Sequence, residues 1–394
     1  MSVLNSGQPA AHPSWVRAAA AVLGTSLMLA VLVIAFALPA AHSAPHQIPI
    51  GIVGTPQQVD GFSSRATVFR VHTYSSEADA RAAILHRDVY GAVVLDTPGA
   101  VPVLVASAAS PAVAALVQAA GQQISVATHR AAHAEDVRAF PARDPKGTGL
   151  AAGALPLALG GWIGAMVIML LVPGPVGRLL GALAFAIVGG LTVVATLQFI
   201  IGTFDGSFAM TSIAGMFGIA ATCVTVLGLR ELLGGAGLGV AAVLLVLLGN
   251  PLSGLATAPE FLPAPWGVIG QFLPPGATGT LMRDVAFFDG HGAGSPIITL
   301  ACYLAIGLTM YLFAVSRGRR TGTVDVDRVE FDHRARPTPA LPDDPDAVIT
   351  ERLDGAGRPG PAAPQRPGPV RINADPARAH HHEGVNGSTT RWHR

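Results

Sequence analysis

The stretch LLGALAFAIVGGLTVVATLQFII, residues 179–201, decides the fold class of this chain. It carries no charged side chain, and about 20 apolar residues are enough for a helix to cross the hydrocarbon core of a bilayer. Backbone polar groups inside a bilayer have to be satisfied within the segment itself, which a helix achieves. The stretch therefore predicts a transmembrane helix.

Five other apolar stretches predict spans of the same kind, and Leu232–Leu248 is the weakest because it is short and begins with several glycines. Only 12% of the residues are charged, against roughly 25% in an average soluble domain. We therefore expect an α-helical polytopic membrane protein with about six transmembrane helices. The expected spans are Val16–Leu38, Leu150–Val172, Leu179–Ile201, Phe208–Leu229, Leu232–Leu248 and Ile297–Val315.

Arginine counts in the short loops predict the orientation, because basic residues collect on the cytoplasmic side. One side collects Arg17, Arg178, Arg230, Arg317, Arg319 and Arg320, and the other Asp205, Glu260, Asp284 and Asp289, with Arg283 as the exception. We expect a multi-pass protein of the plasma membrane with both termini in the cytoplasm. The first apolar run is longer than that of a signal peptide, which favours a retained helix over a cleaved one.

Residues 44–146, between the first two expected spans, have the pattern of a small extracytoplasmic α/β domain. The segments QIPIGIVG, TVFRVHTY, VYGAVVLD and VPVLVAS predict strands, the first of them half-buried. One helix is expected after the N-cap Ser76, with Ala80, Ala83 and Ile84 buried, and a longer one from Ser110 and Pro111. A further helix near PQQVDGFSSR is left open.

The two ends of the chain are expected on the cytoplasmic side. Residues 1–15 form a short N-terminal segment, and residues 316–394 are rich in proline, glycine and charge, which predicts a disordered tail. Lys146 is the only lysine among many arginines. Together with the alanine, glycine and proline content, this is typical of a GC-rich, actinobacterial genome.

Sites of common enzymes are not apparent in this sequence, and we expect no catalytic residues, no metal and no cofactor. A P-loop requires lysine within G-x-x-x-x-G-K-[ST], and Lys146 lies in RDPKGTG instead. His129 and His133 lie four apart on an expected helix, a spacing that can hold a metal, but no third ligand accompanies them. We interpret the pair as a solvated helix face. No basic groove indicates nucleic-acid binding.

Three pairs of glycines four residues apart predict close helix packing in lipid. Two interpretations stay open: these glycines allow helices of one chain to pack together, or they form the interface between two copies. The pairs are Gly149 with Gly153, Gly160 with Gly164, and Gly235 with Gly239.

Residues 249–290 separate the last two expected spans with many prolines and glycines and hardly a charge before Arg283. Irregular backbone at membrane depth is tolerated only where protein or water covers it. Trp266 is placed to lie at the level of the lipid headgroups. We expect a re-entrant or interfacial element that caps the helices on the outer side.

Four segments together resemble the ABC-2-type transporter permeases, in the branch that includes the phage-infection-protein-like membrane proteins. The resemblance covers residues 16–315 and includes the layout of one helix, a large outer domain and five helices. The segments are SSEADARAAILHRDVYGAVVLD, DPKGTGLAAGALPLALGGWIGA, LGNPLSGLATAPEFLP and FLPPGATGTLMRDVAFF.

The resemblance implies the transmembrane subunit of an exporter that moves amphipathic or lipid-like substrates or polymers outward. It implies a separate nucleotide-binding ATPase subunit and a second permease, identical or related, within the lipid bilayer. It also implies that Arg178, Arg230 and Glu231 lie on the side of the ATPase. An outer gate is implied at Asn250, Pro251, Gly254, Pro274, Pro275 and Gly276; turn formation and anchoring are the alternative roles of all these residues.

The chain departs from the family pattern before its first span. Such permeases often have an amphipathic coupling helix there, and MSVLNSGQPAAHPS is too short and too rich in proline to form one. A second function is therefore weighed beside transport. In this alternative the chain is a non-transporting membrane protein that uses its outer domain as a binding or envelope-assembly platform.

Overall fold

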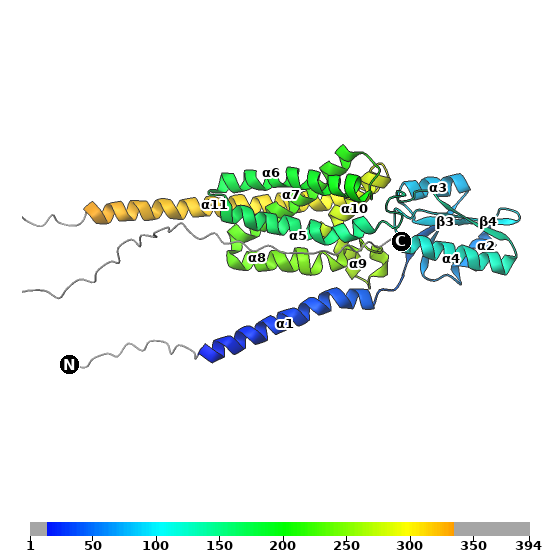
Figure 1. Cartoon of the computed structure of the whole chain (residues 1–394), viewed down its shortest axis with the longest axis horizontal. Coiled ribbons are helices and arrows are strands. Elements are labelled where there is room, and N and C mark those ends of the chain that lie inside the picture. The colour runs from blue at the N-terminus through cyan, green and yellow to red at the C-terminus, as the bar shows by residue number, and fades with distance from the viewer. Residues whose placement is uncertain (1–13, 335–394) are drawn as a thin grey trace, which may run out of the picture. The chain divides into compact units, whose positions relative to one another are not determined.

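The computed structural model describes residues 14–334 of the chain, and the expected N-terminal segment and most of the tail lie outside this range. The chain divides into two units, residues 1–328 and 329–394, of which the first holds nearly all the described elements. That unit consists of an apolar helix, an α/β domain and a helical bundle (Figure 1).

The α/β domain contains a five-stranded sheet in the order β2-β1-β3-β4-β5. β1 pairs in parallel with β2 and β3, β4 pairs in parallel with β5, and β3 and β4 are antiparallel. All six residues of β1 are buried, so this strand is not half-buried as expected; helices cover both faces of the sheet. The strands are β1 (Ile48–Val53), β2 (Phe69–Tyr74), β3 (Gly91–Val94), β4 (Ala100–Val105) and β5 (Ala131–Asp136).

Three helices flank this sheet, two on one face and one on the other (Figure 1). The expected caps are confirmed: the Ser76 side chain accepts a hydrogen bond from the backbone of Asp79, and Ser110 caps the longer helix with Pro111 as its first residue. Thr55 and Gln58 form a capping box for the helix that the sequence left open. The helices are α2 (Pro56–Ser63) and α4 (Pro111–Thr128), and α3 (Glu77–Leu85) opposite them.

The prediction of a helix around His129 and His133 is wrong. His129 ends α4 in the left-handed conformation, and His133 lies in β5, paired with Pro102 of β4. β5 is the edge strand of the sheet, its residues are largely exposed, and its pairing with β4 holds it in an extended conformation. The helical spacing that could have brought the two rings together is therefore absent.

Three apolar helices of the described part are long enough to cross a membrane: Pro175–Ile201, Phe208–Leu233 and Gly294–Arg317. Long apolar helices are confirmed at three of the expected spans, while shorter apolar helices occupy the other three, and the six-span topology stays a prediction. The elements are α1 (Ser14–Ala41), α5 (Thr148–Leu171), α6 (Pro175–Ala195), the π-helix η1 (Thr196–Ile201), α7 (Phe208–Leu233), α8 (Gly235–Ala242), the π-helix η2 (Val243–Leu248) and α11 (Gly294–Arg334).

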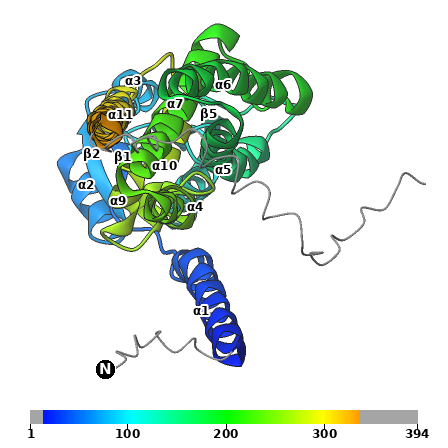
Figure 2. The ribbon, with the colours of Figure 1, turned by 90° about the vertical axis from the view of Figure 1, so that its left-hand side faces the viewer.

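The central helix of the bundle is α7, most of whose residues are buried by its neighbours. Glycines let these neighbours approach its backbone closely. A Cβ on Gly190 of α6 would lie 2.6 Å from the amide nitrogen of Met216, and one on Gly228 would lie 2.3 Å from the carbonyl of Gly307 in α11. Figure 2 shows α7 between α6 and α11, with α1 extending away from the bundle, which it contacts at η2.

Helix α11 corrects the expected start of the disordered tail. It continues to Arg334, whereas the tail was expected from residue 316. No proline occurs between Pro296 and Pro337, so nothing in the sequence forces the helix to end at the last apolar residue. The expectation for residues 335–394 lies outside the described residues.

Asp144 fixes the start of α5 where the chain leaves the α/β domain. One carboxylate oxygen accepts hydrogen bonds from the amide and the hydroxyl of Thr148, and the other from the amide of Gly149 (2.8 Å) and the hydroxyl of Thr203 (2.7 Å). Burial opposes ionisation, but these bonds outweigh it and hold the pKa of Asp144 below its ordinary value. The segment thus joins α5 to the end of η1.

Replacing Asp144 by alanine is expected to destabilise the protein by about 2 kcal/mol, since the first amides of α5 lose their acceptor. Because its folded pKa is lowered, the carboxylate stabilises fully above the unfolded value of about 3.9 and loses its effect as the pH falls further. Urea unfolding in mild detergent should therefore show a larger deficit at pH 7 than at pH 3. An equal deficit at both values would contradict this role, and Asp144→Asn, which keeps one acceptor, should be intermediate.

Candidate functional site at the junction of the α/β domain and the bundle

The Gly/Pro segment between η2 and α11 folds into four short helical elements. Proline is the first residue of three of them, where its missing N–H needs no partner. This accounts for Pro251, Pro259 and Pro274, three of the six prolines that interrupt the apolar pattern. The elements are the 3-10 helices η3 (Pro251–Ser253) and η4 (Pro259–Phe261), and the α-helices α9 (Trp266–Gln271) and α10 (Pro274–Phe287).

The glycines of this segment allow backbone to lie directly on backbone. A Cβ on Gly270 would lie 1.7 Å from the carbonyl oxygen of Leu252, and one on Gly276 would lie 2.2 Å from that of Gly270. Gly254 has a φ of 66°, a conformation that favours glycine. The segment is therefore a tightly folded unit, and we call its last helix, α10, the plug.

The plug is almost entirely buried and packs against α7. A Cβ on Gly218 of α7 would lie 2.3 Å from the side chain of Thr278, so the two helices meet at a glycine. The Thr278 hydroxyl donates to the carbonyl of Pro274 within the plug, so this hydroxyl is paired at the contact. The plug is thus held inside the end of the bundle that faces the α/β domain, which we call the domain end.

The six residues expected to form an outer gate lie in two parts of this segment. Asn250, Pro251 and Gly254 surround η3, and Pro274, Pro275 and Gly276 begin the plug. Contacts of α9 with η3 and of Gly249 with the Pro275 ring bring the two parts together. Their role as a gate stays a prediction.

A buried ion pair joins the α/β domain to the plug. Nε of Arg87, which follows α3, lies 3.0 Å from Oδ1 of Asp284, and the two side chains are 13% and 1% exposed. The Arg87 guanidinium also lies 4.9 Å above the ring centre of Phe288. Gly292 passes over the pair, where a Cβ would lie 2.9 Å from Oδ2 of Asp284.

Three more groups complete this contact. The hydroxyl of Tyr90 donates to Glu260 (2.9 Å), and the fully enclosed Arg283 donates to the carbonyl of Leu255 (3.0 Å). We call Arg87, Tyr90, Glu260, Arg283 and Asp284 the junction. It holds two guanidinium groups and two carboxylates, so its charges balance.

The junction is electrostatically strained. Burial raises the pKa of Asp284 to about 6 against the attraction of Arg87 and Arg283, and burial lowers the pKa of Arg283 to about 10. Burial, and then the neighbouring Glu260, raise the pKa of Tyr90. Within the described part, Nε of Arg283 and Oδ2 of Asp284 are buried without a hydrogen-bond partner. The junction is therefore sensitive to the loss of any one charge.

Arg138 adds a second connection between the α/β domain and the bundle. Its guanidinium donates to the carbonyls of Phe287 (2.6 Å) and Ala286 (3.4 Å) at the end of the plug. It also pairs with Asp205 in the loop before α7, at 3.2 Å. The plug is thus bonded to the domain at two places.

Sequence reasoning did not identify the junction. Arg87 and Asp284 are far apart along the chain, and although both lie in segments that carry the family resemblance, that resemblance implies no role for either. The available signal was that Arg283 and Asp284 are the only charged residues between Glu260 and Asp289. Adjacent opposite charges in such an apolar stretch require partners, but the sequence does not say which residues supply them.

The opposite end of the bundle brings together the three residues expected near an ATPase. Nη1 of Arg178 lies 2.7 Å from Oε1 of Glu231, and both side chains are partly exposed. Together with Arg230 they line a cavity of about 340 Å³ whose other walls include Met166, Met169 and Leu238. Their contact with a partner stays a prediction.

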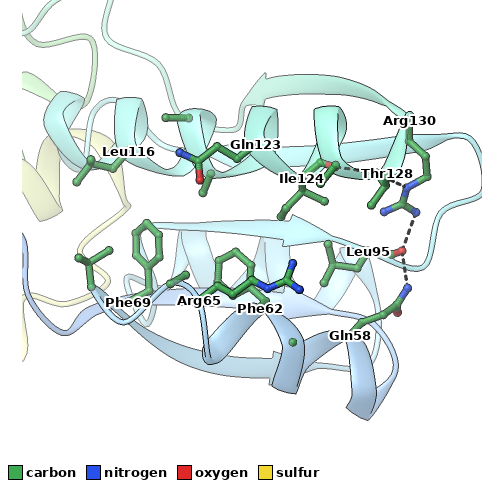
Figure 3. Close-up of a pocket in the computed structure, with 16 residues that line it drawn as sticks. Gln58, Phe62, Arg65, Phe69, Leu95, Leu116, Gln123, Ile124, Thr128 and Arg130 are labelled. Carbon is green, nitrogen blue, oxygen red and sulfur yellow. Dashed lines mark hydrogen bonds between the residues drawn. The ribbon is translucent and has the colours of Figure 1, made fainter.

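A larger cavity, of about 580 Å³, lies in the α/β domain between α2 and α4. Side chains of the two helices face each other across it, over one face of the sheet (Figure 3). Its apolar walls include Phe62, Phe69, Leu95, Leu116 and Ile124. The volume is that of a site for a small organic ligand.

The chain was compared with protein-family models, curated proteins and solved structures. None of the three comparisons gave a match. The function has to be inferred from the contacts and cavities of the chain itself.

Proposed function

We propose that the chain is the transmembrane permease subunit of an ABC-type exporter, which moves an amphipathic or lipid-like substrate outward. A separate ATPase subunit supplies the energy. In this proposal the α/β domain lies outside the plasma membrane and both termini lie in the cytoplasm. The three long apolar helices and the arginine distribution support this arrangement.

The observation that carries the proposal is the distribution of charge and space along the bundle. The domain end is filled by the plug and fastened by the junction, whereas the opposite end has a cavity edged by Arg178, Arg230 and Glu231. The charged residues of the three long apolar spans, Arg178, Arg230, Glu231 and Arg317, all lie near the ends of these spans, and none lies midway, where it could serve as a proton relay. Energy from a partner at the charged end is consistent with this pattern.

A second copy or a related permease completes the proposed transporter. Most large apolar side chains described in α1 are exposed, and the positions of Gly160, Gly235 and Gly239 meet no other atoms within 4 Å of a built Cβ. By contrast, Gly149, Gly153 and Gly164 face side chains of the same chain. The open glycines and α1 are the surfaces that we assign to lipid and to the second permease.

The decisive experiment is purification of the full chain from its native membrane in mild detergent. We expect an ATP-hydrolysing subunit to accompany the chain and its turnover to rise when the chain is present. Arg230→Glu should lower this stimulation at least several-fold, because it reverses the charge at the edge of the proposed contact. Arg70→Glu, on an exposed strand position of the α/β domain, serves as the matched control.

Absence of any ATP-hydrolysing partner would favour the second candidate function. In that candidate the chain does not transport and presents its α/β domain as a binding or assembly platform. The cavity between α2 and α4 is the observation that favours it, since this cavity is the larger of the two described above.

A further inference from the structure

The charged side chains that line the cavity between α2 and α4 are all positive. Two guanidinium groups, of Arg65 and Arg130, and two carboxamides, of Gln58 and Gln123, line it, and no carboxylate is among its lining residues. Apart from Thr128, the remaining lining residues are apolar. A ligand that matches this lining carries negative charge and a hydrocarbon portion.

Two of the polar groups, those of Gln58 and Arg130, lie at one end of the cavity (Figure 3). Nη1 of Arg130 donates to the carbonyls of Leu95 (2.8 Å) and Thr97 (3.1 Å), and Gln58 donates to the same Leu95 carbonyl (3.1 Å). This end lies beyond the carboxyl ends of β1 and β3, where the connections of a sheet with this order diverge and ligands commonly bind. Arg130 is thereby held in place by the backbone.

Arg65 projects into the cavity between its two ends (Figure 3). Within residues 14–334, no ion pair or side-chain hydrogen bond is recorded for Arg65, although Arg81, Arg87, Arg138 and Arg178 all have carboxylate partners. A guanidinium with free donors can bind a carboxylate or a phosphate through two parallel hydrogen bonds. Arg65 is therefore the group available for the charged end of a ligand.

The other end of the cavity is apolar. Phe69 and Leu116 lie there (Figure 3). Small residues, Gly61, Ala119 and Ala120, also line the cavity, and a Cβ built on Gly61 would meet nothing within 4 Å. The core behind this lining also includes Ala258 and is packed by Phe261, both from the Gly/Pro segment, so the apolar end lies on the side of the bundle.

We infer that this cavity binds a single-chain acyl lipid with an anionic headgroup, held by Arg65 and with its chain directed toward Phe69 and Leu116. The inference concerns the ligand of the α/β domain and holds whether the chain transports that ligand or only senses it. It is therefore separate from the proposed ATPase contact at the opposite end of the bundle.

The test uses the full chain in nanodiscs of zwitterionic phosphatidylcholine and a photoreactive dodecanoate probe, with labelled peptides located by mass spectrometry. We expect labels in α2 and α4 that unlabelled dodecanoate displaces and dodecanol does not. Dodecyl phosphate as competitor distinguishes a phosphate from a carboxylate headgroup. Displacement by either anion supports the inference, and equal displacement by dodecanol overturns it.

Two variants with matched controls complete the test. Arg65→Gln should weaken displaceable labelling about tenfold, the loss expected for a charge-assisted hydrogen bond, while Arg70→Gln should not. Ala120→Trp should fill the cavity and abolish labelling, while Ala115→Trp, at an exposed position of the same helix, should not. Unchanged labelling in both Arg65→Gln and Ala120→Trp, or labels confined to the bundle, would refute the site.

Discussion

Replacing Asp284 by alanine is expected to destabilise the folded protein by about 3–5 kcal/mol, the usual cost of removing one partner of a buried ion pair. The loss leaves the largely buried Arg87 and the fully enclosed Arg283 without this counter-charge. Chemical denaturation of the full chain in mild detergent measures the change. Limited proteolysis should also show faster cleavage between the α/β domain and the bundle, because the junction holds them together.

The matched control is Arg81→Ala, which removes a pair with Glu135 on the surface of the α/β domain. Exposed pairs contribute about 1 kcal/mol or less, so this variant should remain close to the wild type. Similar effects of the two substitutions would show that the Arg87–Asp284 contact is not a buried ion pair in the protein. Substituting Arg87 and Asp284 together by apolar residues should recover part of the stability.

The pH dependence of Arg87→Ala provides an internal check on the same contact. Asp284 has a folded pKa raised to about 6, and its stabilising effect falls as the pH rises from the unfolded value of about 3.9 toward 6. Removing Arg87 takes away a cation that favours the carboxylate, so the pKa of Asp284 rises further. The deficit of the variant should therefore be small at pH 5 and larger at pH 7.5.

Replacing Gly270 by alanine is expected to have an effect of similar size, about 3 kcal/mol, through overpacking. The added Cβ would lie 1.7 Å from the carbonyl oxygen of Leu252 and 2.5 Å from its carbon. Both are backbone atoms, which cannot move aside by a change of rotamer, so α9 has to shift away from η3. The plug, which packs on α9, should loosen as a result.

Gly239→Ala is the matched control because Gly239 lies in a helix, α8, and meets no atom within 4 Å of a built Cβ. Alanine is about 1 kcal/mol better than glycine inside a helix, so this variant should equal or exceed the wild type in stability. The denaturation midpoint of the purified protein measures the stability of both variants. A Gly270→Ala protein as stable as the wild type would show that α9 and η3 are not in contact.

The fold couples the position of the plug to that of the α/β domain. The plug is bonded to the α/β domain through Asp284 and through the carbonyls that accept from Arg138, and it packs against the central helix α7. A shift of the α/β domain is therefore expected to move the plug. In an exporter of the proposed kind, this is the contact through which the domain and the end of the transport path communicate.

Several elements could be predicted from the sequence because their causes are local. Ser76 and Ser110 predict the starts of α3 and α4, because the first amides of a helix lack backbone partners and need a side-chain acceptor. Predominantly apolar stretches without charge, 179–201 and 208–229, predict two of the long helices, because a helix pairs the backbone groups within the stretch itself. Each of these signals lies within a few residues of the structure it specifies.

Elements whose stability comes from distant partners were missed. The segment with His133 was assigned to a helix because its strand character depends on β4, which supplies the hydrogen bonds. The Gly/Pro segment is expected to cap the helices, yet its glycines specify only that other backbone approaches closely, not that η3 faces α9. Likewise, Arg178, Arg230 and Glu231 are expected on the same side of the membrane, but only the folded structure places them around one cavity.

The sequence by itself determined where apolar helices form, that an α/β domain is inserted between them, and that this chain has no P-loop of its own. Only the tertiary structure decided that Asp284 of the plug pairs with Arg87 and that Arg65 faces an apolar cavity without a carboxylate. The physical reason is the distance along the chain over which each kind of interaction acts. Hydrophobicity and capping act over a few residues, whereas burial makes a charge depend on groups that the chain brings together from far apart.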